Sequence, residues 1–123
     1  MAKLNHLSIL VRDWKISRDW YVENIGLVVE FEIPERKTAA LKDAADVTLF
    51  VSETTDTPVE PTCGLFFEVD DVEATYRRLV ERGVTFLSAP QKLFWGYGAE
   101  ASDPDGYHVG LWDERTMKEK GGH

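Results

Sequence analysis

The chain has 123 residues, of which 43% are apolar and 11% aromatic, enough to fill the core of one compact domain. Its 14 basic and 22 acidic residues give a net charge of −8, which repels nucleic-acid phosphates and anionic lipid surfaces. The single cysteine, Cys63, cannot form an internal disulfide, and no apolar stretch resembles a signal peptide or is long enough to span a bilayer. We therefore expect a cytoplasmic protein without nucleic-acid or membrane partners.

The first half of the chain predicts a strand, a helix and three further strands. An alternating apolar run predicts a strand over 4–11, and Asp13 then stands where a helix N-cap belongs. The helix is expected from about Trp14 to Asn24, and Gly26 ends it. The three strands that follow are expected at 27–33, 37–42 and 47–52.

The second half repeats this pattern. A segment rich in Thr, Pro and acidic residues, 53–62, is typical of a linker. After it come an apolar run at 64–69, an N-cap at Asp71 and a helical pattern that ends at Gly83. The further strands are expected near 85–87, 98–101 and 107–112.

The repeat predicts one domain of the α+β class, built from two βαβββ modules that complete one another's sheet. Module one covers about 1–52 and module two about 63–113, with the linker 53–62 between them. Residues 114–123 are expected to form a tail whose end, 118–123, frays, and no role is assigned to His123.

Alternation along the opening strand of each module separates a helix-facing side from a side suited to lining a cavity. In the first strand Ile9 belongs to a fully apolar row, whereas His6 and Ser8 interrupt the opposite row. In the second module Phe66 and Glu68 occupy the equivalent cavity-side row. These polar residues in apolar company are the first candidates for a binding site.

Five short motifs stand in order along the chain, at 4–13, at Trp20-Tyr21 ahead of Gly26-Leu27, at 67–72, at Trp95-Gly96 and at 103–106. Together they resemble the vicinal oxygen chelate superfamily, which includes glyoxalases, extradiol dioxygenases, fosfomycin resistance enzymes and bleomycin resistance proteins. The resemblance spans nearly the whole chain. It implies that the two modules curl into an open barrel-like sheet around a cavity, commonly in a homodimer.

The resemblance also implies where a metal would be held in the superfamily's enzymes. The family ligands are a His on the first strand, a His, Gln or Glu that opens the fifth, and a Glu on the last. Only His6 matches, because Gly64 and Gly110 stand at the other two positions and glycine offers no side-chain donor. We therefore expect no metal and no other cofactor. A displaced site made of His6, Glu68 and His108 is the alternative.

The aromatic residues suggest what the cavity binds. Trp95 and Tyr97 belong to a segment that the resemblance places over the cavity mouth, where their rings would stack on a planar or cationic ligand. Trp112 shares a strand face with His108 and Gly110, and the missing side chain at Gly110 is expected to leave room for ligand.

Three roles are possible for the Glu68 side chain, because a charged residue beside aromatic neighbours needs a partner. It pairs with Arg12, it binds a cationic ligand, or its pKa is raised and it moves a proton. No catalytic residue is named. The residues predicted to contact a ligand are His6, Ser8, Phe50, Glu68, Trp95, Tyr97, His108 and Trp112.

The sequence favours a metal-independent small-molecule binding protein, similar to the bleomycin resistance group, in which the cavity sequesters a drug without transforming it. The alternative is a lyase or dioxygenase of the glyoxalase and dioxygenase type, using a divalent metal at a displaced site. A third reading is a structural or regulatory dimer whose cavity is filled with side chains. Fold alone does not separate the three, because one scaffold hosts all of them.

Overall fold

The computed structural model describes residues 1–122, so His123 lies outside the described residues. The chain divides into two compact units, one from Met1 to Glu60 and one that begins at Pro61. Each unit carries the βαβββ order that the sequence predicts, and each builds its own open four-stranded sheet. The α+β class and the two modules are thereby confirmed. No helix in the described part of the chain is long and apolar enough to cross a membrane.

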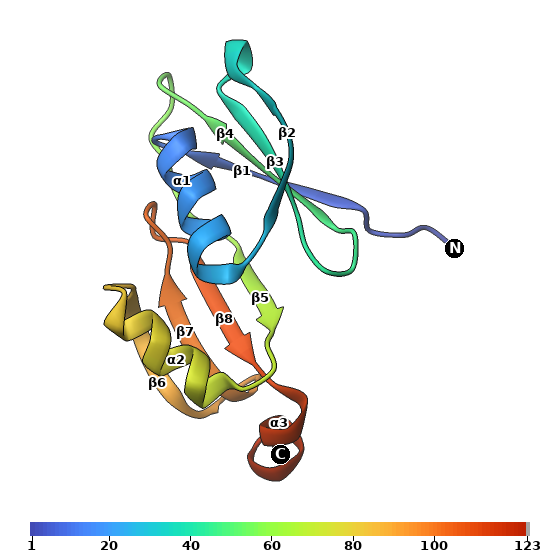
Figure 1. The fold of residues 1–123 in the computed structure, drawn as a ribbon, viewed down its shortest axis with the longest axis vertical. Helices are drawn as coiled ribbons and strands as arrows, with labels where there is room; N and C mark the ends of the chain where they lie inside the picture. Colours follow the sequence, from blue (N-terminus) through green and yellow to red (C-terminus); the bar gives the residue numbers. More distant parts are fainter. Residues whose placement is uncertain (123) are drawn as a thin grey trace. The chain divides into compact units, whose positions relative to one another are not determined.

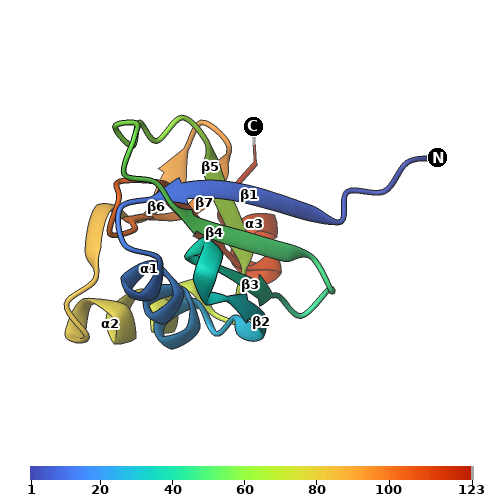
Figure 2. The same ribbon diagram turned by 90° about the horizontal axis from the view of Figure 1, so that it is seen from above.

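The first unit has the strand order β1-β4-β3-β2, in which β1 runs parallel to β4 beside it (Figure 2). Asp13 caps the helix by accepting hydrogen bonds from Lys15 N and Ile16 N, and Gly26 ends it at a φ of 87°. Its elements are β1 (His6–Val11), α1 (Trp14–Trp20), a π-helical turn (Tyr21–Ile25), β2 (Val28–Ile33), a 3-10 turn (Pro34–Arg36), β3 (Thr38–Lys42) and β4 (Thr48–Glu53).

The second unit has the equivalent order β5-β8-β7-β6, in which β5 runs parallel to β8. Asp71 caps its helix by accepting from Ala74 N, as the sequence predicts. Its elements are β5 (Gly64–Glu68), α2 (Val72–Glu81), β6 (Thr85–Leu93), β7 (Gly96–Ser102), β8 (His108–Trp112) and α3 (Glu114–Lys120).

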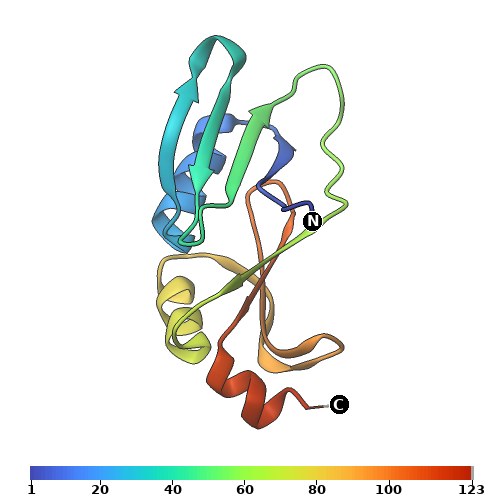
Figure 3. The same cartoon turned by 90° about the vertical axis from the view of Figure 1, so that its right-hand side faces the viewer.

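In each unit one helix lies along one face of the sheet and buries the apolar side chains of that face (Figures 1 and 3). Ile9 and Val11 of β1 are buried on this side in the first unit, and Leu65 of β5 with Leu79 of α2 in the second. Alternation along the strands leaves every second residue on the opposite face. We call this opposite side the helix-free face.

Two predicted boundaries differ from the structure. The expected tail contains a helix, α3, because Asp113 accepts hydrogen bonds from Thr116 N at 2.6 Å and from Val72 N at 2.7 Å. This buried carboxylate caps α3 and holds the start of α2 at once. In addition, β6 extends to Leu93 and β7 begins at Gly96, so a tight hairpin turn connects the two strands.

Candidate functional site

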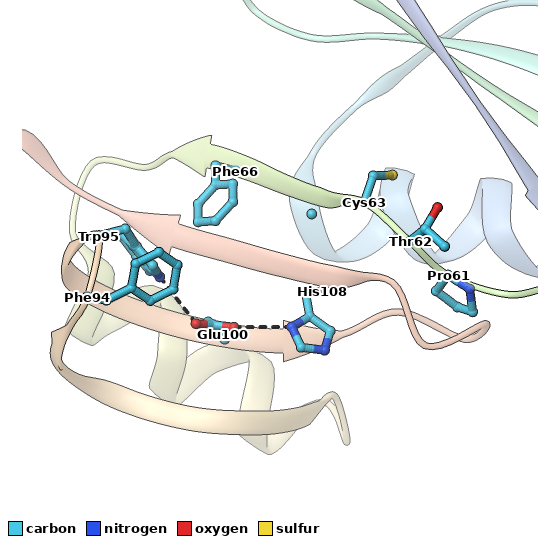
Figure 4. A pocket seen from close by; sticks show the side chains of 9 residues that line it. Pro61, Thr62, Cys63, Phe66, Phe94, Trp95, Glu100 and His108 are labelled. Carbon is cyan, nitrogen blue, oxygen red and sulfur yellow. Dashed lines mark hydrogen bonds and ion pairs between the residues drawn. The ribbon is translucent and has the colours of Figure 1, made fainter.

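The second unit contains a pocket of about 340 Å³ on the helix-free face of its sheet (Figure 4). Phe66 enters it from β5, Glu100 from β7 and His108 from β8, while Trp95 comes from the turn between β6 and β7. The residues that complete the lining are Pro61, Thr62, Cys63, Gly64 and Phe94.

Two aromatic rings lie directly on glycines of the sheet. A Cβ atom on residue 110 would lie 2.6 Å from Phe66 Cε2, and a Cβ atom on residue 98 would lie 2.5 Å from Trp95 Cη2. The rings of Phe66 and Trp95 meet edge to face, with centroids 5.1 Å apart and an interplanar angle of 80°. The room expected at Gly110 is therefore filled by Phe66, which is a correction to the sequence prediction.

Glu100 links the two ends of the pocket. Trp95 Nε1 donates a hydrogen bond to Glu100 Oε1 at 3.2 Å, and His108 Nδ1 lies 3.3 Å from Glu100 Oε2. The Glu100 side chain is 19% exposed and that of His108 is 61% exposed. An acid largely shielded from water thus holds an indole on one side and an accessible imidazole on the other (Figure 4).

Sequence reasoning did not single out Glu100. One signal was available, because Glu100 stands between Ala99 and Ala101, which are both fully buried on the helix-facing side of β7. An acid that alternates with core alanines must lie on the opposite face. In the ladder it is the direct partner of Gly110.

Two predicted ligand contacts, Glu68 and Trp112, lie on the same face but outside the pocket. Glu68 and Trp112 are partners in the ladder between β5 and β8. Their pair lies four residues further along the strands than the pair of Gly64 and His108 in the pocket, which corresponds to about 13 Å. Glu68 is exposed to solvent, so the sequence argument for a shielded charge between aromatic neighbours does not apply. Glu68 and His108 are also too far apart to ligate one ion together.

Tyr97 faces the other side of the sheet. Its hydroxyl lies 3.0 Å from Glu73 Oε1 on α2 and 3.3 Å from the Pro90 carbonyl oxygen. Burial raises the pKa of the Tyr97 phenol, and the hydrogen bond and negative charge of Glu73 raise it further. Because β7 begins earlier than predicted, alternation places Tyr97 opposite Glu100 and away from the pocket.

The remaining predicted residues gather in the first unit. Ser8 pairs with Phe50 across β1 and β4, and the His6 ring meets the Phe50 ring edge to face at 5.4 Å. His6 Nδ1 lies 2.7 Å from Asn5 Oδ1, and the histidine is exposed. His6, Ser8 and Phe50 therefore form a small group on the helix-free face of the first sheet.

The residues present do not fit the metal site that the family resemblance implies. Gly64 and Gly110 supply no donor atoms, and the ring of Phe66 occupies the space next to residue 110. Among residues 1–122, no group of three or more His, Cys, Asp or Glu side chains is placed to hold a metal ion.

The sequence profile of the Glyoxalase/Bleomycin resistance protein/Dioxygenase superfamily matches residues 3–111. TnmS3, an antibiotic binding protein from Streptomyces sp. CB03234, is 32% identical with a TM-score of 0.75, over 92% of this chain and 96% of TnmS3. A possible glyoxalase from Bacillus cereus is 21% identical with a TM-score of 0.75, over 91% of this chain and 99% of the other. The uncharacterized protein YurT of Bacillus subtilis (strain 168) is 29% identical over 100 residues, which are 70% of this chain and 79% of YurT.

Proposed function

The chain belongs to the Glyoxalase/Bleomycin resistance protein/Dioxygenase superfamily, and we propose that it is a metal-independent member that binds a planar or cationic small molecule. The proposed site is the pocket of the second unit. The observation that carries the proposal is the pair of rings, Phe66 and Trp95, that lie on glycines with Glu100 at their edge. The likeness to TnmS3, an antibiotic binding protein, supports sequestration of a drug-like molecule as the role.

The pocket has the physical properties that such a ligand needs. A volume of about 340 Å³ is at the lower end of small-molecule sites, which suits a compound of a few fused rings. The faces of Phe66 and Trp95 attract planar rings and cations, and the carboxylate of Glu100 favours positive charge close by. The net charge of −8 raises the local concentration of cationic compounds.

Metal independence rests on the donor set. Two of the three family ligand positions are Gly64 and Gly110, and Phe66 covers the second of them. The group His6, Ser8 and Phe50 and the pair Glu68 and Trp112 stay predictions as ligand contacts. The homodimer, expected from the family resemblance, and the cytoplasmic location, expected from the single free thiol of Cys63, are parts of the same proposal.

The test combines metal analysis with ligand binding. Protein without a tag is dialysed against EDTA, its divalent metal content is measured, and it is titrated with proflavine, a planar cation, and 7-methoxycoumarin, a planar neutral compound. We expect negligible metal and saturable binding. Trp95→Leu should weaken binding about tenfold, whereas Trp20→Leu, on α1 of the first unit, should leave it unchanged.

Two outcomes would overturn the proposed function. A near-stoichiometric ion that survives dialysis, or ligand binding that is lost after dialysis against EDTA and restored by added Zn²⁺ or Mn²⁺, would overturn metal independence and favour the glyoxalase or dioxygenase alternative. Absence of binding by both compounds would overturn the choice of pocket and favour the reading in which side chains fill the cavity.

A further inference from the structure

We propose that His108 offers its Nε2 atom as a hydrogen-bond acceptor to the ligand, so that planar aromatic compounds carrying a hydroxyl group are the preferred class. This inference rests on the proposed function and narrows it. It follows from the contact between His108 and Glu100, from the way in which Glu100 is held, and from the free space beside the imidazole.

The contact between His108 and Glu100 sets the position of the imidazole hydrogen. His108 Nδ1 lies 3.3 Å from Glu100 Oε2, and an ionised carboxylate can only accept. The negative charge of that oxygen favours a hydrogen over a lone pair on the ring nitrogen that faces it, so a neutral imidazole carries its hydrogen on Nδ1 and its lone pair on Nε2. Nε2 is then an acceptor, not a donor.

Glu100 is itself held in place. Its other oxygen accepts from Trp95 Nε1 at 3.2 Å, and its side chain is only 19% exposed. Each carboxylate oxygen thus already has a partner inside the pocket. Glu100 is a positioning residue that ties the stacking surface of Trp95 to the orientation of His108.

The imidazole is open to a ligand on its β5 side. The residue paired with His108 across the ladder is Gly64, which has no side chain to cover the ring, and His108 is 61% exposed. Figure 4 shows Trp95 and His108 on opposite sides of Glu100 within one pocket. A ring that stacks on Trp95 and Phe66 can therefore extend a hydroxyl group towards His108, where Nε2 accepts its hydrogen.

The test uses two compounds that differ in one group. 7-Hydroxycoumarin and 7-methoxycoumarin share their rings, but only the first can donate from position 7. We expect the full-length protein to bind 7-hydroxycoumarin about five- to tenfold more tightly, the usual effect of one hydrogen bond, in calorimetric titrations. In His108→Phe this ratio should fall to about one through loss of 7-hydroxycoumarin affinity alone. Tyr76→Phe, which removes a hydroxyl from α2, should keep the wild-type ratio.

The positioning role of Glu100 is tested separately, through the tautomer of His108. In nitrogen NMR of the ligand-free protein, His108 should be the tautomer with hydrogen on Nδ1, and Glu100→Ala should shift it towards the tautomer with hydrogen on Nε2. The same variant should lower the ratio of affinities to about twofold or less. A purely structural role for Glu100 would change stability without changing the tautomer.

The outcomes separate this inference from the proposed function. If the wild-type protein binds both coumarins equally, or if His108→Phe keeps the preference, the inference is wrong and the proposed function stands. If His108 has its hydrogen on Nε2 in the wild-type protein, the inference is also wrong. If neither coumarin binds the folded protein, the proposed pocket fails and the inference with it.

Discussion

The ring of Phe66 lies over Gly110, its direct partner in the ladder between β5 and β8. A Cβ atom on residue 110 would lie 2.6 Å from Phe66 Cε2, so the glycine and the ring depend on each other. By the family resemblance, position 110 is where the metal-binding Glu stands. In this chain the same place supports an aromatic surface, which is the physical basis of the binding function that we propose.

The two glycines under the aromatic rings should respond differently to substitution. In Gly110→Ala the three heavy atoms nearest to the new methyl group all belong to the Phe66 ring, so we expect a loss of about 1 kcal/mol that Phe66→Ala partly restores in the double variant. In Gly98→Ala the methyl group overlaps the carbonyl oxygen of Leu111, so the loss should be about 3 kcal/mol, and Trp95→Ala should not restore it. Urea unfolding of the single and double variants measures both. Equal rescue at the two positions would contradict this account.

Restoring a carboxylate at position 110 should not restore a metal site. Gly110→Glu still lacks a donor at Gly64, and its side chain competes with the ring of Phe66 for space. We expect no Zn²⁺ or Mn²⁺ to remain after dialysis of Gly110→Glu or of Gly110→Glu with Phe66→Ala, measured by elemental analysis. Retention of one ion per chain by either variant would show that a site close to the family's own persists here.

Asp113 should make the stability of the protein depend on acid pH. Burial alone would raise the pKa of Asp113, but hydrogen bonds from Val72 N and Thr116 N together lower it below its usual range. Because the folded-state pKa lies below the unfolded value of about 3.9, the stabilisation is complete above that value and is lost as the pH falls through the folded-state pKa.

Asp113→Asn should therefore cost about 1–3 kcal/mol at neutral pH, and the difference from the wild-type protein should shrink below about pH 4. Asp71→Asn, which alters a cap that accepts from Ala74 N, is the matched comparison and should cost about 1 kcal/mol or less. Urea titrations at several pH values measure both variants. A penalty for Asp113→Asn that is constant from pH 7 down to about pH 2 would contradict the assignment.

Tyr97 should contribute to stability and not to ligand binding. Tyr97→Phe removes the hydrogen bond to Glu73, so we expect a loss of about 0.5–1.5 kcal/mol with unchanged affinity for 7-methoxycoumarin. The tyrosinate absorbance of Tyr97 should also develop above the usual pKa of about 10. Since the folded-state pKa of Tyr97 is raised, the stabilisation of the fold by its protonated hydroxyl is present below about pH 10 and is lost as the pH rises further. Weaker ligand binding by Tyr97→Phe would contradict the placement on the α2 side.

Local signals in the sequence were enough to predict the fold. Asp13 and Asp71 each stand before a helical pattern, and Gly26 and Gly83 each end one with a positive φ. These signals are short-range, so they can be read from neighbouring residues. The helix at 114–120 was not predicted, although its cap, Asp113, accepts from Thr116 N in the same local way as Asp71 accepts from Ala74 N. Only the second bond of Asp113, from the distant Val72 N, lies beyond any local pattern.

The pocket was predicted less completely, because it depends on register between strands. The sequence identified Trp95 and His108, but not Glu100 of β7, the acid that connects them, although its alternation with the core residues Ala99 and Ala101 indicates its face. Because β7 starts at Gly96 and not at Gly98, it includes Tyr97, which alternation puts on the helix side, opposite Glu100. The packing of Phe66 on Gly110 joins two strands that are far apart in the sequence.

Metal-independent binding in this pocket is tested most directly by the indole N–H signal of Trp95 in a proton–nitrogen NMR titration with 7-hydroxycoumarin in the presence of EDTA. The chain has four tryptophans, so Trp95→Phe assigns the signal by its loss. We expect this signal to shift in a saturable way while the indole signal of Trp14, in the first unit, stays in place. No shift with EDTA present, followed by a shift after Zn²⁺ or Mn²⁺ is added, would contradict metal-independent binding in this pocket.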